Sequence, residues 1–151
     1  MSAAKAKGTR WETALVRFFR AATVRAFRPA QEGFRDTGDL HGLDPFTGQA
    51  KDWTSWQAAI REGLDGAERQ RVNAGQNYGV AFVKRARAST GRGYAVMTVA
   101  TFARVLLRLR RAEALLAELA GPSDVFAEHC AQTARELTAD FDALAKSRTE
   151  E

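Results

Sequence analysis

Apolar and polar residues follow a helical period near the start of the chain. Apolar side chains recur every three to four positions over residues 9–24, which predicts an amphipathic helix with one buried stripe. Thr9 followed by Glu12 fits a capping box in the first turn. The stripe consists mainly of Trp11, Leu15, Phe18 and Ala22, and Val16 and Phe19 widen it.

The same period returns after residue 51. A second helix is predicted from an N-cap at Asp52 to a stop at residues 73–75, which read Asn-Ala-Gly. Trp53 and Trp56 fall on its apolar stripe, which favours burial in the core, although both side chains could instead stack on exposed bases. Gly63 and Gly66 weaken this helix.

Shorter segments predict strands. Residues 39–43, 46–51 and 94–97 are predicted to be short strands, although the composition of residues 46–51 is weak for a strand, and residues 24–28 are a further candidate for a first strand. Residues 78–83 are apolar on both alternating faces, as in a central strand covered on both sides. The order of elements predicts an α/β domain, a small mixed sheet with helices on its faces.

The C-terminal part is predicted to be helical. A third helix begins at Thr98 or Thr101 and runs to about Leu119, and Gly121-Pro122 separates it from a last helix capped by Ser123. The two can form a hairpin. We therefore expect a first domain over residues 1–111 and a helical extension over residues 112–151, packed on the first domain or used for dimerisation. The apolar seam of the last helix is Phe126, Cys130, Thr133, Leu137, Phe141 and Leu144.

Charge is distributed unevenly along the chain. Residues 1–111 carry a net charge of +11, and residues 112–151 carry −6. A basic body with an acidic tail indicates a polyanionic partner for the body, such as DNA. A solvated basic surface is the alternative. Since no apolar run is long enough to span a membrane and the N-terminus lacks an apolar signal segment, we expect no membrane association. A single cysteine, Cys130, favours a reducing cytoplasm.

An acid, an amide and a cation are predicted to meet at one end of the sheet. Asp39 begins one predicted strand, and Gln49 lies on the next. Lys51 follows Gln49 by two residues, so both side chains point to the same face. Mg²⁺ prefers oxygen ligands and takes one or two carboxylates from protein. This pattern indicates phosphodiester hydrolysis assisted by Mg²⁺, with Mn²⁺ as a substitute.

These residues resemble the PD-(D/E)XK nuclease superfamily, and within it the Holliday junction resolvases of the archaeal and bacteriophage type. The resemblance covers roughly residues 5–107, and it depends on the order and spacing of several short motifs. The matching stretches are residues 7–12 (KGTRWE), 35–42 (RDTGDLHG), 49–51 (QAK), 73–85 (NAGQNYGVAFVKR) and 94–97 (YAVM).

The resemblance implies a restriction-endonuclease-like fold and a homodimer that cuts four-way junctions. It implies metal ligation by Glu12, Asp39 and Gln49, with Lys51 as the catalytic lysine. Family members usually carry Glu where this chain has Gln49, and a neutral amide weakens metal binding. Glu12 also has a structural interpretation, as the capping-box partner of Thr9.

The function expected from the sequence is therefore metal-dependent cleavage of DNA at four-way junctions. The alternatives are a nuclease for other branched DNA and a non-catalytic, structure-selective DNA-binding protein on a nuclease scaffold. Because a junction is recognised by its shape, contacts to phosphates are expected to dominate. The candidate DNA-binding residues are Arg10, Arg28, Arg35, Lys84, Arg85, Arg87 and Arg92.

Overall fold

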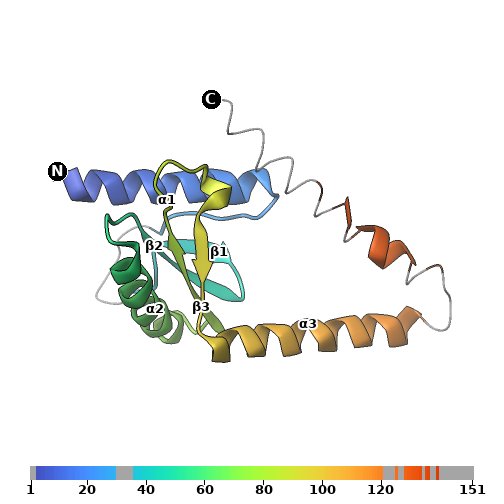
Figure 1. Ribbon diagram of the computed structural model, residues 1–151. Coiled ribbons are helices and arrows are strands. Elements are labelled where there is room, and N and C mark those ends of the chain that lie inside the picture. Colours follow the sequence, from blue (N-terminus) through green and yellow to red (C-terminus); the bar gives the residue numbers. More distant parts are fainter. Residues whose placement is uncertain are drawn as a thin grey trace. The chain divides into compact units, whose positions relative to one another are not determined.

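The structure consists of two compact units, residues 1–98 and residues 99–151. The computed structural model describes residues 3–29, 36–120, 125, 128–133, 135–136 and 139. In chain order its elements are α1 (Ala3–Ala21), β1 (Leu40–Leu43), β2 (Phe46–Lys51), α2 (Trp56–Asn73), β3 (Tyr78–Val83), the 3-10 helix η1 (Thr90–Arg92), β4 (Tyr94–Val96) and α3 (Val99–Ala120) (Figure 1).

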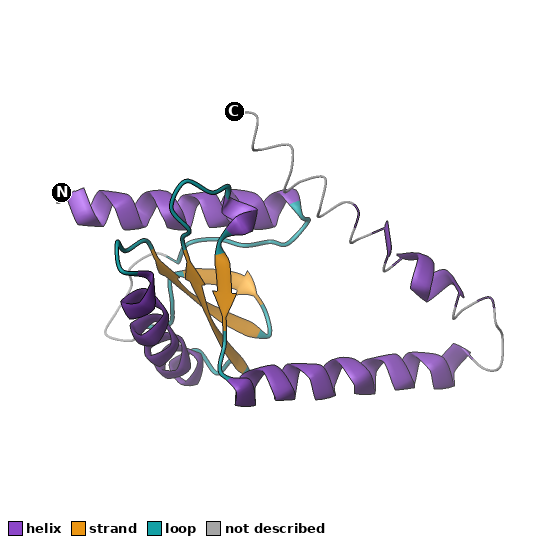
Figure 2. Ribbon diagram, viewed as in Figure 1, coloured by secondary structure: helices purple, strands orange, loops and turns teal. Residues whose placement is uncertain are grey.

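The first unit is built on a four-stranded mixed sheet in the order β1-β2-β3-β4. The central pair, β2 and β3, is parallel, and α2 forms the crossover between them. The two outer pairs, β1 with β2 and β3 with β4, are antiparallel (Figure 2). The predicted α/β class with a mixed sheet is therefore confirmed.

Helices cover both faces of this sheet, as the pattern of β3 predicts. All six residues of β3 are buried. Val80 and Phe82 belong to a cluster with Trp11 and Leu15 of α1. Because side chains alternate along a strand, the residues between them face the other way, and there Ala81 packs in a cluster with Ala59 of α2.

The predicted strands are reproduced more closely than the helix starts. β2 and β3 have the predicted bounds, and β1 and β4 differ from prediction by one residue. The weak first strand is reduced to a single bridge between Phe27 and His41. α1 begins at Ala3 rather than near Thr9, so the capping box was wrong. α2 is capped by Ser55 and not by Asp52, because the Ser55 side chain accepts the backbone N–H of Ala58.

The second unit begins with α3, which matches the predicted third helix. α3 continues without a break through residue 111, where the sequence suggested a domain boundary. Ser123, Phe126, Leu137, Phe141 and Leu144 of the predicted last helix lie outside the described residues. Among the helices in the described ranges, none combines the length and apolar character that crossing a membrane demands.

Candidate functional site

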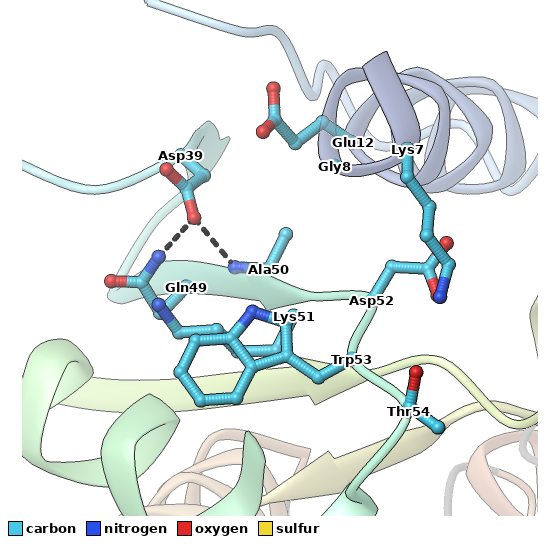
Figure 3. A pocket seen from close by; sticks show the side chains of 10 residues that line it. All are labelled: Lys7, Gly8, Glu12, Asp39, Gln49, Ala50, Lys51, Asp52, Trp53 and Thr54. Carbon is cyan, nitrogen blue, oxygen red and sulfur yellow. Dashed lines mark hydrogen bonds and ion pairs between the residues drawn. The ribbon is translucent and has the colours of Figure 1, made fainter. Parts of the chain in front are cut away.

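The predicted site residues meet in one pocket of the first unit. Since β1 and β2 are antiparallel, the start of β1 lies beside the end of β2, and the N-terminal half of α1 lies above this edge (Figure 3). The pocket has a volume of about 480 Å³. Its lining residues are Lys7, Gly8, Glu12, Asp39, Gln49, Ala50, Lys51, Asp52, Trp53 and Thr54.

Asp39 is the central acid of the pocket. Its Oδ2 accepts a hydrogen bond from the backbone N–H of Ala50 at 2.8 Å, and a second from Nε2 of Gln49. Burial raises the pKa of Asp39 above its ordinary value, and the negative charge of Glu12 adds to that effect. The Ala50 hydrogen bond and the charge of Lys51 oppose it. Both hydrogen bonds go to one oxygen, and among the described residues Oδ1 has no hydrogen-bond partner.

Glu12 reaches the same pocket from α1. Its position in the third turn of the helix excludes the capping-box role. Its Oε2 forms an ion pair with Nε of Arg28 at 2.7 Å, and its side chain is only 19% exposed. Arg28 was a candidate for binding DNA, and in the structure it compensates the charge of Glu12. The second oxygen, Oε1, lies on the side of Gly8, which lines the pocket.

Gln49 belongs to a buried chain of amides and carboxylates. Its Nε2 donates to Asp39, and its Oε1 accepts from Nε2 of Gln70 at 2.6 Å. The same Gln70 nitrogen donates to both carboxylate oxygens of Asp36 at 2.8 Å. Oε1 of Gln70 is buried and has no hydrogen-bond partner among the described residues. Two glutamine amides and two aspartates therefore interact in one network, with one acceptor unsatisfied.

Lys51 lies beside Gln49 on the α2 side of the sheet, which confirms the predicted shared face. Gln49 pairs with Ala81 and Lys51 with Val83, two residues of the cluster that packs on α2. Nζ of Lys51 lies 5.2 Å from the ring centroid of Trp53. Its charge also acts on Asp39. The ammonium group therefore lies over an aromatic ring at the pocket, close enough to Asp39 to influence its pKa.

Two glycines of α2 make room for these side chains. A Cβ at Gly66 would lie 2.8 Å from Oε1 of Gln49, and a Cβ at Gly63 would lie 3.3 Å from Cγ of Lys51. The glycines weaken the helix by propensity, yet they let it pack closely over the two site residues. The close packing thus explains why glycine occupies positions 63 and 66 despite its low helix propensity.

Asp52 closes one side of the pocket through two ion pairs. Its side chain is 6% exposed and pairs with Lys7 at 3.2 Å and Lys84 at 3.0 Å. These bonds join α1, the segment after β2 and the segment after β3. Lys84 was predicted to bind DNA, and in the structure its ammonium group neutralises this buried carboxylate.

The other candidate DNA-binding residues differ in their surroundings. Arg10, Arg85, Arg87 and Arg92 are exposed. Arg85 lies with its guanidinium carbon 5.9 Å from the ring centroid of Tyr94. Arg35 lies outside the described residues. The exposed arginines belong to α1 and to the segment between β3 and β4.

The oxygen donors of the pocket that could hold a divalent cation are Asp39, Glu12 and Gln49. In the part of the chain that the structure describes, no three Asp, Glu, His or Cys side chains are placed to hold a metal ion together. Asp39 and Glu12 each retain one carboxylate oxygen. Gln49 would supply a third oxygen only after its amide turns, because its Oε1 now accepts from Gln70 and its Nε2 donates to Asp39. The rotated NH₂ would face Nε2 of Gln70, which now donates to Gln49, so the Gln70 amide would have to turn as well and would lose its hydrogen bonds to Asp36.

The roles of two contributors to the pocket were not predicted from the sequence. Gln70 donates a hydrogen bond to Gln49. In the sequence, the one indication of this role is that Gln70 is a polar residue on the buried face of α2, three positions after Ala67. Asp52 resembled an ordinary helix cap. The expectation that Trp53 and Trp56 are core residues was wrong, because they are 40% and 50% exposed.

Comparison of the chain with family models, curated proteins and solved structures found no match.

Proposed function

We propose that this protein is a metal-dependent endonuclease that cleaves DNA phosphodiesters at four-way junctions. The observation that carries this proposal is the convergence of Glu12, Asp39 and Lys51 on one pocket, with one oxygen of each acid unoccupied by the described residues. Three different elements supply these groups. Mg²⁺ is usually bound through one or two carboxylates, and a nearby ammonium group can offset negative charge on the phosphate.

Each residue has a distinct role in this proposal. Asp39 and Glu12 hold Mg²⁺, or Mn²⁺ in its place, and Gln49 adds a neutral oxygen. The bound cation would supply charge neutralisation at the phosphate and a water of lowered pKa. Lys51 orients the attacking water or offsets negative charge on the phosphate, because its ammonium group is anchored at the pocket by Trp53. Arg28 limits the repulsion between the two acids by pairing with Glu12.

Contacts with the DNA backbone would come from the exposed arginines. Arg85, Arg87 and Arg92 lie in one loop that precedes β4, and Arg10 lies on α1. Phosphate contacts of this kind position a duplex without reading its sequence, which suits an enzyme that selects by shape. A homodimer would place two pockets on one junction for symmetric cuts. The restriction-endonuclease-like fold is part of the same proposal, supported by the mixed sheet and the resemblance described above.

One observation favours a second candidate, a structure-selective DNA-binding protein without catalysis. The Gln49 amide donates to Asp39 and so occupies an oxygen that a metal would otherwise use. A third carboxylate at this position would raise metal affinity. If the metal affinity of the pocket is too low at cellular concentrations, the basic surface would still bind DNA. A nuclease for other branched substrates is the corresponding alternative within enzymes.

A cleavage assay on synthetic DNA separates these functions. A four-way junction, a nicked duplex and a flapped duplex are incubated with the full chain in Mg²⁺, in Mn²⁺ and in EDTA. Paired nicks in the junction that need metal and are lost in Lys51→Ala support the proposal. Tight junction binding with no nicks in either metal supports the binding protein, and preferential cutting of the flap supports the other nuclease.

A further inference from the structure

Three exposed aromatic side chains gather next to the pocket. Trp53 is 40% exposed, Trp56 50% and Tyr94 40%, all within the first unit. The rings of Trp56 and Tyr94 lie 6.3 Å apart between centroids. A single exposed aromatic residue needs no explanation, but three on neighbouring segments form a surface that folding alone does not require. We call Trp53, Trp56 and Tyr94 the aromatic surface.

Two cations accompany these rings. Lys51 lies over Trp53, and Arg85 lies over Tyr94, at 5.2 Å and 5.9 Å from the ring centroids. Aromatic rings interleaved with cations bind single-stranded nucleic acid in many proteins, since the rings stack on bases while the cations contact phosphates. Trp, Tyr and Arg also occur at protein interfaces, but the net charge of +11 on residues 1–111 favours a polyanionic partner. The surface therefore has the chemistry of a nucleotide-binding surface.

The register of the sheet connects this surface to the pocket. Lys51 of β2 pairs with Val83 of β3, and Val83 pairs with Tyr94 of β4. Residues paired in this way lie in one row across the sheet, on the same face. Trp53 and Lys51 also line the pocket that holds Asp39 (Figure 3). A strand of DNA whose phosphate reaches Asp39 thus has aromatic rings immediately beside it.

We infer that the aromatic surface stacks unpaired bases of DNA next to the phosphate that is cleaved. The inference rests on the proposed function and specifies its substrate further, as branched DNA with unpaired nucleotides at or near the branch. Bases inside an intact duplex are stacked on each other and offer no free face to Trp53, Trp56 or Tyr94. Fraying at a branch point supplies free faces, and stacking is independent of sequence because every base has a π face.

Tryptophan fluorescence tests this inference without catalysis. The chain has three tryptophans, and Trp11 is 3% exposed with its Nε1 hydrogen bonded to the carbonyl of Phe82, so quenching by added DNA reports on Trp53 and Trp56. The full chain is titrated in EDTA with a twelve-residue oligothymidine and with an abasic oligomer of the same length and charge. We expect quenching by oligothymidine only, and an affinity for it about tenfold higher than for the abasic oligomer.

Variants then assign the effect to the rings. Trp53→Ala and Trp56→Ala are each expected to lower the affinity for oligothymidine by roughly 5-fold, which lies within the tenfold preference, and to leave the affinity for the abasic oligomer unchanged. Phe27→Ala is the matched control, because Phe27 is an aromatic residue of similar exposure, 45%, that does not line this pocket. It is expected to bind both oligomers as the wild type does. Circular dichroism verifies that each variant is folded.

The outcomes separate this inference from the proposed function. Equal affinity for the two oligomers, or loss of affinity for both in the tryptophan variants, overturns base stacking. A change in self-association with unchanged oligothymidine affinity also overturns it, since the surface would then be an interface between copies. If stacking is observed but no DNA is cut in any metal, base stacking by the aromatic surface stands and the nuclease proposal fails. If branched DNA is cut equally by the wild type and both variants, the nuclease proposal stands and base stacking beside the cleaved phosphate fails.

Discussion

The hydrogen atom that serves as the side chain of Gly66 leaves the space in which the Gln49 amide lies. A Cβ at this position would approach Oε1 of Gln49 to 2.8 Å, closer than side-chain carbons normally come. The amide is thereby held between α2, Gln70 and Asp39. Helix packing and the geometry of the pocket are coupled at this point, so substitutions in α2 should change the site without touching its ligands.

Replacing Gly66 by alanine should lower stability and disturb the pocket. The added methyl group must displace Gln49, and overpacking of this kind destabilises by about 1–3 kcal/mol, which offsets the gain of up to about 1 kcal/mol in helix propensity. Urea unfolding measures the net change. Gly8→Ala is the matched control, because the nearest atom to its Cβ is 3.8 Å away in the same kind of helix. We expect Gly8→Ala to stabilise by about 0.5–1 kcal/mol; equal stabilisation by both variants would contradict the contact.

Asp39 should reduce stability at neutral pH. Burial raises its pKa, so the folded protein binds a proton more strongly than the unfolded chain does. Between the ordinary value of 3.8 and the raised folded value, stability therefore falls as pH rises, and the penalty is complete above that window. Asp39→Asn keeps an acceptor for Ala50 and Gln49 without the charge.

The pH dependence of this variant is the measurement. We expect Asp39→Asn to be more stable than the wild type at pH 7.5 in metal-free buffer, with the difference disappearing as the pH falls toward 4. DNA cleavage should be lost at every pH. A variant that is less stable than the wild type at pH 7.5 would show that the ionised carboxylate is stabilising and that the burial argument fails.

Gln49→Glu should convert a weak metal site into a strong one. The new carboxylate cannot donate to Asp39, and the two negative charges repel each other, so the metal-free variant should melt at a lower temperature than the wild type. Mg²⁺ or Mn²⁺ should reverse this, because three carboxylates then share one cation. Thermal unfolding with and without metal measures both effects.

Gln76→Glu is the control for this experiment. Gln76 likewise donates to an aspartate, Asp44, but the pair is exposed and lies away from Glu12. The metal-induced increase in melting temperature should be much smaller for Gln76→Glu than for Gln49→Glu. Equal increases would mean that the position of the new carboxylate is irrelevant and that Gln49 is not a ligand.

Lys84 should be important for stability rather than for DNA binding. Lys84→Met leaves the buried Asp52 carboxylate with Lys7 alone, and we expect a loss of about 1–2 kcal/mol, reduced from a fully buried pair because the Lys84 side chain is 37% exposed. Arg87→Ala, in the same loop, should change stability by less than about 0.5 kcal/mol. Filter binding of a junction at two salt concentrations should show the opposite order of effects: the salt dependence of DNA binding should be weaker for Arg87→Ala than for Lys84→Met. Equal stability of the two variants would contradict the structural role of Lys84.

The sequence predicted the strands well because their signals are local. The uninterrupted apolar run of β3 specifies a strand covered on both sides, and the two-residue spacing of Gln49 and Lys51 predicts their shared face. Helix starts were less predictable, since they depend on which polar side chain reaches the first free N–H groups. Ser55 does so, while Asp52 is taken by two lysines from distant segments.

The partners of the site residues could not be read from the sequence. Arg28 lies sixteen residues from Glu12, and Gln70 lies twenty-one residues from Gln49, so neither pairing has a helical or strand period. The exposure of Trp53 and Trp56 was missed for a related reason. The spacing of Trp53 and Trp56 fits the apolar stripe of α2. However, α2 begins at Trp56, so Trp53 precedes the helix and Trp56 lies before its first buried residue.

Crystals of the full chain grown with Mn²⁺ test the central claim most directly, because manganese is located by its anomalous scattering. The account predicts one anomalous peak in the pocket, within coordination distance of oxygens from both Glu12 and Asp39, with the Gln49 carbonyl turned toward it. It also predicts that the peak is absent in Asp39→Asn crystals treated in the same way. An empty pocket at saturating Mn²⁺, with Gln49 still donating to Asp39, would contradict the account.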